Sequence, residues 1–63
     1  MKVTFKERKP VGSEFLQVMD LPQVPRIGEY VTLNSDDAAW LVYMVDWMLD
    51  NSRNPHAIVT LKG

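Results

Sequence analysis

The acidic residues that could do chemistry in this chain are few and lack partners. Asp46 stands in an apolar stretch, and the nearest acid along it is Asp50, which belongs to a polar turn. A solvent-facing carboxylate is the expectation for Asp46. Asp36 and Asp37, with Asn34, offer oxygen ligands of the kind that hard cations take. Ordinary turn chemistry explains these three residues without an ion, and no metal site is predicted.

The single histidine, His56, offers no better case for catalysis. The chain has no cysteine, and its serines fall in predicted loops without a nucleophile motif. These serines are Ser13, Ser35 and Ser52. Since no pair of titratable groups stands at a useful spacing, the sequence predicts a protein that is not an enzyme, with no catalytic residue and no cofactor.

Basic residues gather at the amino terminus although the net charge is only −1. Lys2, Lys6, Arg8 and Lys9 lie within the first nine positions, together with Phe5. Lysine and arginine bind phosphates and an aromatic ring stacks on bases, so this segment is a candidate nucleic-acid surface. Lysines that blunt the outer face of an edge strand are the competing interpretation.

The stretch Trp40–Leu49, WLVYMVDWML, decides the fold because nine of its ten residues are apolar. Its 3.6-residue spacing permits a helix over residues 36–50, giving an α+β protein, but that helix would be apolar on nearly all sides, and so short a chain could not cover it. A strand with one extra residue, at Tyr43 or Met44, fits better. The strand would point Trp40, Val42, Val45, Trp47 and Leu49 inward, and Asp46, Met48 and Asp50 outward.

Four further strands are predicted: Lys2–Glu7, Glu14–Met19, Glu29–Leu33 and His56–Lys62. The first places Val3 and Phe5 on one face, and the last alternates Ala57, Val59 and Leu61 with polar residues and Ile58. The inward sets expected for the second and third are Leu16 and Val18, continuing to Leu21, and Val31 and Leu33.

Turn-forming residues separate these strands. Lys9–Gly12 and residues 50–55 are predicted turns, and Asn34–Ala39 is a predicted hairpin loop. Two prolines make residues 21–28 an ordered, extended loop in which Gly28 takes a positive φ or meets another backbone closely. The chain is expected to form one domain over residues 1–63, all-β, as a five-stranded small barrel.

One part of the sequence consists of the run Pro25–Leu33, PRIGEYVTL, a polar hairpin, and then Trp40-Leu41-Val42 and Val45-Asp46-Trp47. It resembles a pattern found in small SH3-like β-barrels of bacteria and phages. The resemblance covers residues 21–62. It implies a barrel in which the bent strand after the hairpin carries the core. Such barrels bind proteins, peptides, nucleic acids or nucleotides, so the fold does not define a function.

An apolar patch on the outside of the barrel gives the functional prediction. Tyr30, Tyr43, Met44 and Met48 would all point outward, which is more than scattered apolar exposure. A chain of 63 residues without disulfide or metal has a stability of about 3–5 kcal/mol, and self-association adds buried area.

The sequence thus predicts a non-enzymatic binding module that forms homodimers through this patch. Another protein is an alternative partner, nucleic-acid binding is the second hypothesis, and a phage-type inhibitor or small-molecule sponge is the third. No signal-peptide core and no membrane span is recognised, so a cytoplasmic location without membrane contact is expected.

Overall fold

Five strands form one mixed sheet in the computed structural model, which describes residues 1–49 and 55–63. The strand order across the sheet is β2-β1-β5-β4-β3. The strands are β1 (Lys2–Arg8), β2 (Ser13–Asp20), β3 (Tyr30–Val31), β4 (Trp40–Met48) and β5 (His56–Lys62). Apart from Pro55, the turn predicted for residues 50–55 lies outside the described residues, as do Asp50 and Ser52.

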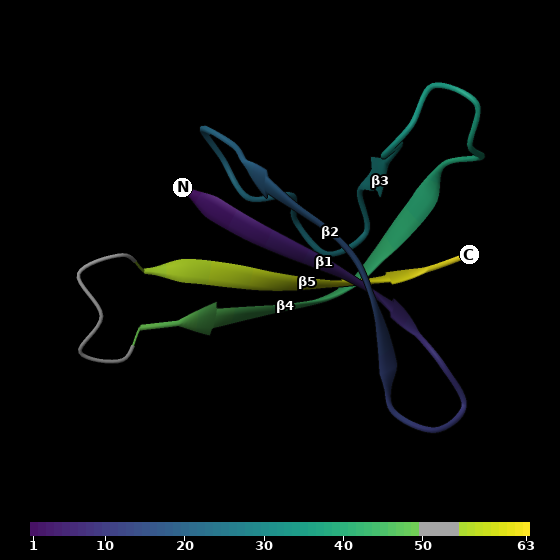
Figure 1. The fold of residues 1–63 in the computed structure, drawn as a ribbon, viewed down its shortest axis with the longest axis horizontal. Coiled ribbons are helices and arrows are strands. Elements are labelled where there is room, and N and C mark those ends of the chain that lie inside the picture. Colours follow the sequence, from purple (N-terminus) through teal and green to yellow (C-terminus); the bar gives the residue numbers. More distant parts are fainter. Residues whose placement is uncertain (50–54) are drawn as a thin grey trace.

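The sheet is strongly curled into a half-barrel (Figure 1). Three neighbouring pairs are antiparallel, whereas β1 and β5 run in the same direction side by side. The all-β prediction with five strands is confirmed. The alternative with residues 36–50 helical is wrong, because Trp40–Met48 is bonded between two strands as β4.

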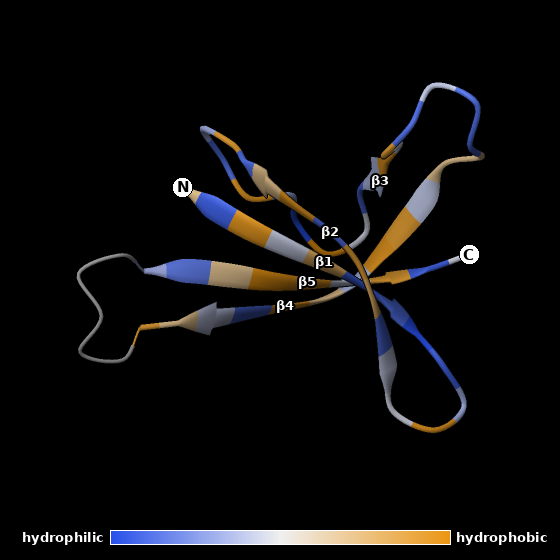
Figure 2. Cartoon of the chain, viewed as in Figure 1, coloured by the Kyte–Doolittle hydropathy of each residue, from blue (hydrophilic) through white to orange (hydrophobic). Residues whose placement is uncertain are grey.

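The core lies on the inner face of the sheet, which carries alternate residues of the central strands. Figure 2 shows hydrophilic and hydrophobic residues alternating along β1. Because side chains of a strand alternate between faces, Val3 and Phe5 fall on one side and are fully buried. The other fully buried side chains are Val42, Ala57, Val59 and Leu61. The predicted alternation in β1 and β5 is therefore confirmed.

The bulge predicted in β4 is present at Tyr43. Val42 is opposite Leu61 and Met44 is opposite Thr60, so Tyr43 is the extra residue. The bulge keeps Trp40, Val42 and Val45 on the inner face, where all three pack in or against the core.

The far end of β4 differs from the prediction. Trp47 pairs with the buried Ala57 and so lies on the inner face, yet 51% of its surface is exposed. Leu49, just beyond the strand, is 69% exposed. Both were predicted as core residues, and this is wrong: they lie past the part of the inner face that the rest of the described chain covers.

The strand β2 contains a second bulge, which the sequence analysis did not anticipate. Phe5 is opposite Gln17 and Lys6 is opposite Phe15, so Leu16 is the extra residue. Leu16 and Leu21 pack against the core as predicted, together with Met19. Val18 was predicted to face inward, which is wrong: it lies opposite Thr4 on the outer face and is 43% exposed.

The proline-containing loop, residues 21–28, passes along the inner face and is fixed by hydrogen bonds. The Gly28 N–H donates to the Val42 carbonyl at 3.0 Å, and the Val42 N–H donates to the Glu29 carbonyl at 2.8 Å. Gly28 has a φ of +92°, in the left-handed region that favours glycine. The positive φ predicted for Gly28 is confirmed.

The third strand is shorter than the predicted Glu29–Leu33, because only Tyr30 and Val31 pair with β4 in strand geometry. Its predicted facing is confirmed: Val31 and Leu33 pack against the core, and Tyr30 is 69% exposed. No helix among the described residues is long and apolar enough to cross a membrane.

Candidate functional site

The outer face of the sheet carries all four predicted partner-binding residues, Tyr30, Tyr43, Met44 and Met48. Tyr43, Met44 and Met48 are 39%, 43% and 37% exposed, and we call these three residues the β4 patch. Met44 is opposite Thr60 and Met48 is opposite His56 on β5. The bulge places Tyr43 next to Met44 without a polar residue between them.

Two features keep the four predicted residues from forming one compact surface. Asp46 lies on the outer face between Met44 and Met48 and is exposed. Tyr30 is opposite Leu41, at the other end of β4. With a rise of about 3.3 Å per residue, Leu41 is about 23 Å from Met48 but only about 7 Å from Tyr43, so Tyr30 lies near the Tyr43 end of the β4 patch and far from Met48.

The basic residues of β1 lie on the same outer face. Because Val3 and Phe5 point inward, Lys2, Lys6 and Arg8 point outward, and Lys2 and Lys6 are opposite His56 and Thr60 of β5. A basic strip and the β4 patch are thus separated by one strand.

Lys9 differs from the other predicted basic residues because its charge is compensated. Its ammonium group lies 3.1 Å from a carboxylate oxygen of Glu7 and 3.2 Å from one of Glu14. The hydrogen bond to Glu7, followed by that to Glu14, raises the pKa of Lys9 above its ordinary value of 10.5. Lys9 is therefore a poorer phosphate ligand than the residues of β1.

Arg8 joins the two predicted sites. Its guanidinium carbon lies 4.5 Å from the centroid of the Tyr43 ring, within the distance of a cation–π contact. The strand β5 lies between the strands that carry these residues. A partner that covers Tyr43 therefore also meets the charge of Arg8.

Two apolar side chains on the outer face were missed from the sequence. Phe15 is 61% exposed and lies opposite Lys6, and Val18 is 43% exposed and lies opposite Thr4. The bulge at Leu16 puts both on the same face of β2. The sequence of β2 did not indicate which of its residues face outward, because apolar residues occur on both faces of the strand.

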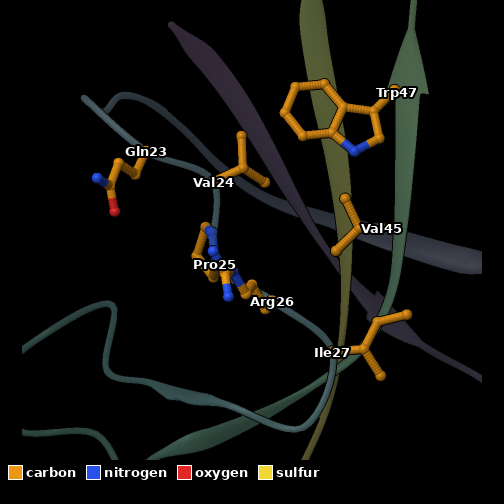
Figure 3. Close-up of a pocket in the computed structure, with 7 residues that line it drawn as sticks. All are labelled: Gln23, Val24, Pro25, Arg26, Ile27, Val45 and Trp47. Atoms are coloured by element: carbon orange, nitrogen blue, oxygen red, sulfur yellow. The ribbon is translucent and has the colours of Figure 1, made fainter.

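A groove on the inner side was also missed. It has a volume of about 780 Å³ and lies between the loop 23–27 and the far end of β4 (Figure 3). We call it the concave groove. Its lining residues are Gln23, Val24, Pro25, Arg26, Ile27, Val45 and Trp47. The groove was not predicted from the sequence because Trp47 was expected to be a buried core residue.

The residues considered for catalysis or metal binding remain apart. Asn34 Nδ2 donates to Asp37 Oδ2 at 3.1 Å, and the Asp37 N–H donates to the Asn34 carbonyl at 2.9 Å, which is turn geometry. His56 is half-buried at the start of β5. Among residues 1–49 and 55–63, no three acidic or histidine side chains are grouped as metal ligands would be.

Comparisons of the chain with protein-family models, with curated proteins and with solved structures found no match. The functional argument therefore depends on the surfaces described above.

Proposed function

We propose that the protein is a non-enzymatic interaction module that self-associates through the outer face of its sheet, centred on the β4 patch. One observation carries the proposal: among the described residues, exposed large apolar side chains outnumber the fully buried ones. Six of the exposed ones lie on the outer face, and apolar side chains gathered on one face are typical of an interaction surface. They are Phe15, Val18, Tyr30, Tyr43, Met44 and Met48. The open half-barrel explains this excess, since one small sheet has two faces and only the inner face has a core.

The free energy gained by burying the β4 patch determines how large the interface of a stable dimer must be. Burying a methionine-sized side chain completely stabilises by about 1.5–3 kcal/mol. Tyr43, Met44 and Met48 are already more than half covered, so each has about 1 kcal/mol left to contribute. Six such side chains in a dimer give about 6 kcal/mol, against an association cost of about 4–15 kcal/mol. The β4 patch alone therefore supports a weak dimer, and a stable one also covers Phe15 and Val18.

The charges of the outer face suit a contact between two copies. The outer face of β4 carries Asp46, and that of β1 carries Lys2 and Lys6. When the two-fold axis runs along β5, which lies between β1 and β4, the acidic strand of one copy lies over the basic strand of the other, and the β4 patches of both copies are covered. Such complementarity sets the register of the pair more than its affinity.

Sedimentation over a concentration series tests the proposal. The parent chain should form a dimer, and the double variant Met44→Asp, Met48→Lys should be a monomer that melts at a lower temperature, because its charges would be desolvated in the interface. Val11→Asp is the matched control, since Val11 is 92% exposed in the turn between β1 and β2 and should leave the dimer intact. A parent chain that remains monomeric at tens of micromolar would exclude self-association.

Nucleic-acid binding is the second candidate, favoured by the outward position of Lys2, Lys6 and Arg8 and by the contact of Arg8 with the Tyr43 ring. Retention of the protein on single-stranded DNA or RNA at increasing salt separates the two candidates. Phosphate contacts weaken steeply with salt, whereas an apolar interface between copies does not. Lys6→Gln should reduce retention under this hypothesis, and Lys9→Gln should change it less, because the charge of Lys9 is already paired.

A relation to the small SH3-like barrels is also part of the proposal. The bulged central strand and the Pro25–Leu33 run support it, while the parallel pair of β1 and β5 in an open sheet is the feature it must accommodate. Pairing of β2 with β3 in solution, seen as protection of their amide hydrogens from exchange, would support a closed barrel, and exchange of both edges would count against it.

A further inference from the structure

The concave groove has the size and lining of a ligand site. Its volume of about 780 Å³ falls within the roughly 300–1,000 Å³ of small-molecule pockets. Figure 3 shows the Trp47 indole and the Val45 side chain projecting from β4 toward the loop that carries Val24 and Pro25. The groove therefore presents an aromatic ring and aliphatic side chains to any molecule that enters it.

Trp47 has the largest apolar side chain among the residues that line this groove, and much of it is exposed to water. Half of its surface is exposed, although it lies on the same face as the buried core. The opposite residue, Ala57, is too small to cover an indole. A planar ring that stacks on Trp47 would remove this apolar surface from water and gain the attraction of an aromatic pair.

The lining residues carry one charge, that of Arg26. The loop that presents Arg26 is ordered: the Arg26 N–H donates to Glu29 Oε1 at 2.6 Å, and the Glu29 N–H donates to the Arg26 carbonyl at 3.0 Å. A guanidinium group binds carboxylates, phosphates and sulfonates through two parallel hydrogen bonds. The guanidinium group of Arg26 is thus complementary to an anion, whereas the Glu29 carboxylate beside it accepts the hydrogen bond of the Arg26 N–H.

We infer that the concave groove binds a small planar aromatic anion, whose ring stacks on Trp47 and whose anionic group pairs with Arg26. The inference is independent of the proposed self-association, because the groove opens on the inner side of the sheet and the β4 patch lies on the outer face. A ligand of this class adds the apolar contact that Trp47 and Ile27 lack among the described residues.

Two dyes of almost the same shape test the inference. The probe 8-anilinonaphthalene-1-sulfonate joins a planar naphthalene ring to a sulfonate anion, and N-phenyl-1-naphthylamine is its uncharged counterpart. The anionic dye should bind the native chain saturably, one molecule per chain. Arg26→Gln should weaken its binding by about fivefold or more while leaving the neutral dye within about twofold. Trp47→Leu should weaken both dyes, since it removes the stacking surface.

Control variants separate this site from the outer face and from unfolding. Lys6→Gln removes a positive charge from the opposite face of the sheet and should not change either dye's affinity. Met44→Asp should abolish self-association without changing dye binding, so each proposal can fail alone. Far-UV circular dichroism of Arg26→Gln and Trp47→Leu should match that of the parent chain. Dye binding that does not saturate, or that ignores both groove substitutions, would overturn the inference.

Competition identifies the anionic group that the site takes. Adenosine monophosphate and indole-3-acetate each join a planar aromatic ring to an anionic group, which is a phosphate in the first and a carboxylate in the second. Displacement of the anionic dye by the nucleotide alone would assign the site to nucleotides, and displacement by indole-3-acetate alone would assign it to aromatic carboxylates. Failure of both to displace the dye at millimolar concentration would show that the groove does not bind this class.

Discussion

Arg8 and Tyr43 are in contact although they come from strands that are not neighbours. The guanidinium carbon of Arg8 lies 4.5 Å from the centroid of the Tyr43 ring, and the contact crosses the outer face of β5. The bulge at Tyr43 makes the contact possible, because it inserts one residue into β4 and reorients the side chain there. Arg8 thus connects the end of β1 with the bulge of β4.

A double-mutant cycle measures this contact. Arg8→Met keeps the length of the side chain and removes its charge, and Tyr43→Leu removes the ring. The coupling free energy between the two should be about 0.5–1 kcal/mol in urea unfolding, as for an exposed cation–π pair. Lys6→Met with Tyr43→Leu is the matched control and should show no coupling. Equal coupling in both cycles would mean that the ring responds to the charge of the whole strand rather than to Arg8.

Phe5 and Trp47 should contribute very differently to stability despite their similar chemistry. Phe5 is 1% exposed and Trp47 is 51% exposed. Phe5→Ala should cost about 3–5 kcal/mol, comparable to the whole stability expected for a domain of this size, so the variant should be largely unfolded. Trp47→Ala should cost about 1–2 kcal/mol and remain folded, because only half of its surface is buried. Urea unfolding followed by circular dichroism checks both, and an unfolded Trp47→Ala chain would contradict the structure.

Alternation in the sequence predicts the central strands well and the edge strand poorly. In β1 and β5 a strict period of two separates buried residues such as Val3 and Val59 from their neighbours. In β2 the run Phe15, Leu16, Val18 and Met19 is apolar on both faces, so the pattern does not choose between registers. The bulge at Leu16 determines the register. The position of the bulge depends on the pairing of β2 with β1, which the sequence of β2 alone does not determine.

The concave groove could not be predicted for a related reason. It brings Arg26 and Trp47 together, and they are far apart in the sequence and have no shared motif. The residue type of Trp47 suggests a core position, but its exposure depends on how far the loop 23–27 reaches along β4. That reach follows from the hydrogen bonds between residues 28–29 and Val42, which only the folded sheet defines.

Gly28 should be sensitive to substitution for a conformational reason. Its φ of +92° is unfavourable for any residue with a Cβ and most of all for a β-branched one, whereas no other group of residues 1–49 and 55–63 lies within 4 Å of where a Cβ would be. Gly28→Val should therefore cost about 1–3 kcal/mol through backbone strain alone. Ile27→Val, next to it and 66% exposed, should cost less than about 0.5 kcal/mol. The two urea midpoints give the comparison, and equal midpoints would show that Gly28 can leave this conformation without cost.

Trp40 holds a polar group that the described part of the chain leaves without a partner. Its indole nitrogen is buried, and no hydrogen-bond acceptor lies within reach of it in residues 1–49 and 55–63. The ring itself packs closely, since a Cβ placed on Gly63 would lie 3.3 Å from Trp40 Cζ3. Burying a donor in this way costs about 1–3 kcal/mol, while the packing of the ring favours the folded state.

Trp40→Phe separates these two contributions. The substitution removes the N–H and keeps an aromatic ring, so the relief of about 1–3 kcal/mol should offset the loss of about 1–2 kcal/mol of apolar burial. The free energy of unfolding should therefore stay within about 1 kcal/mol of the parent value. Trp40→Ala is the control and should cost about 3–5 kcal/mol, because it also removes the ring that packs against the core. If Trp40→Phe in urea were as damaging as Trp40→Ala, the indole N–H would have to be hydrogen-bonded in solution, and its burial would not be a cost to the fold.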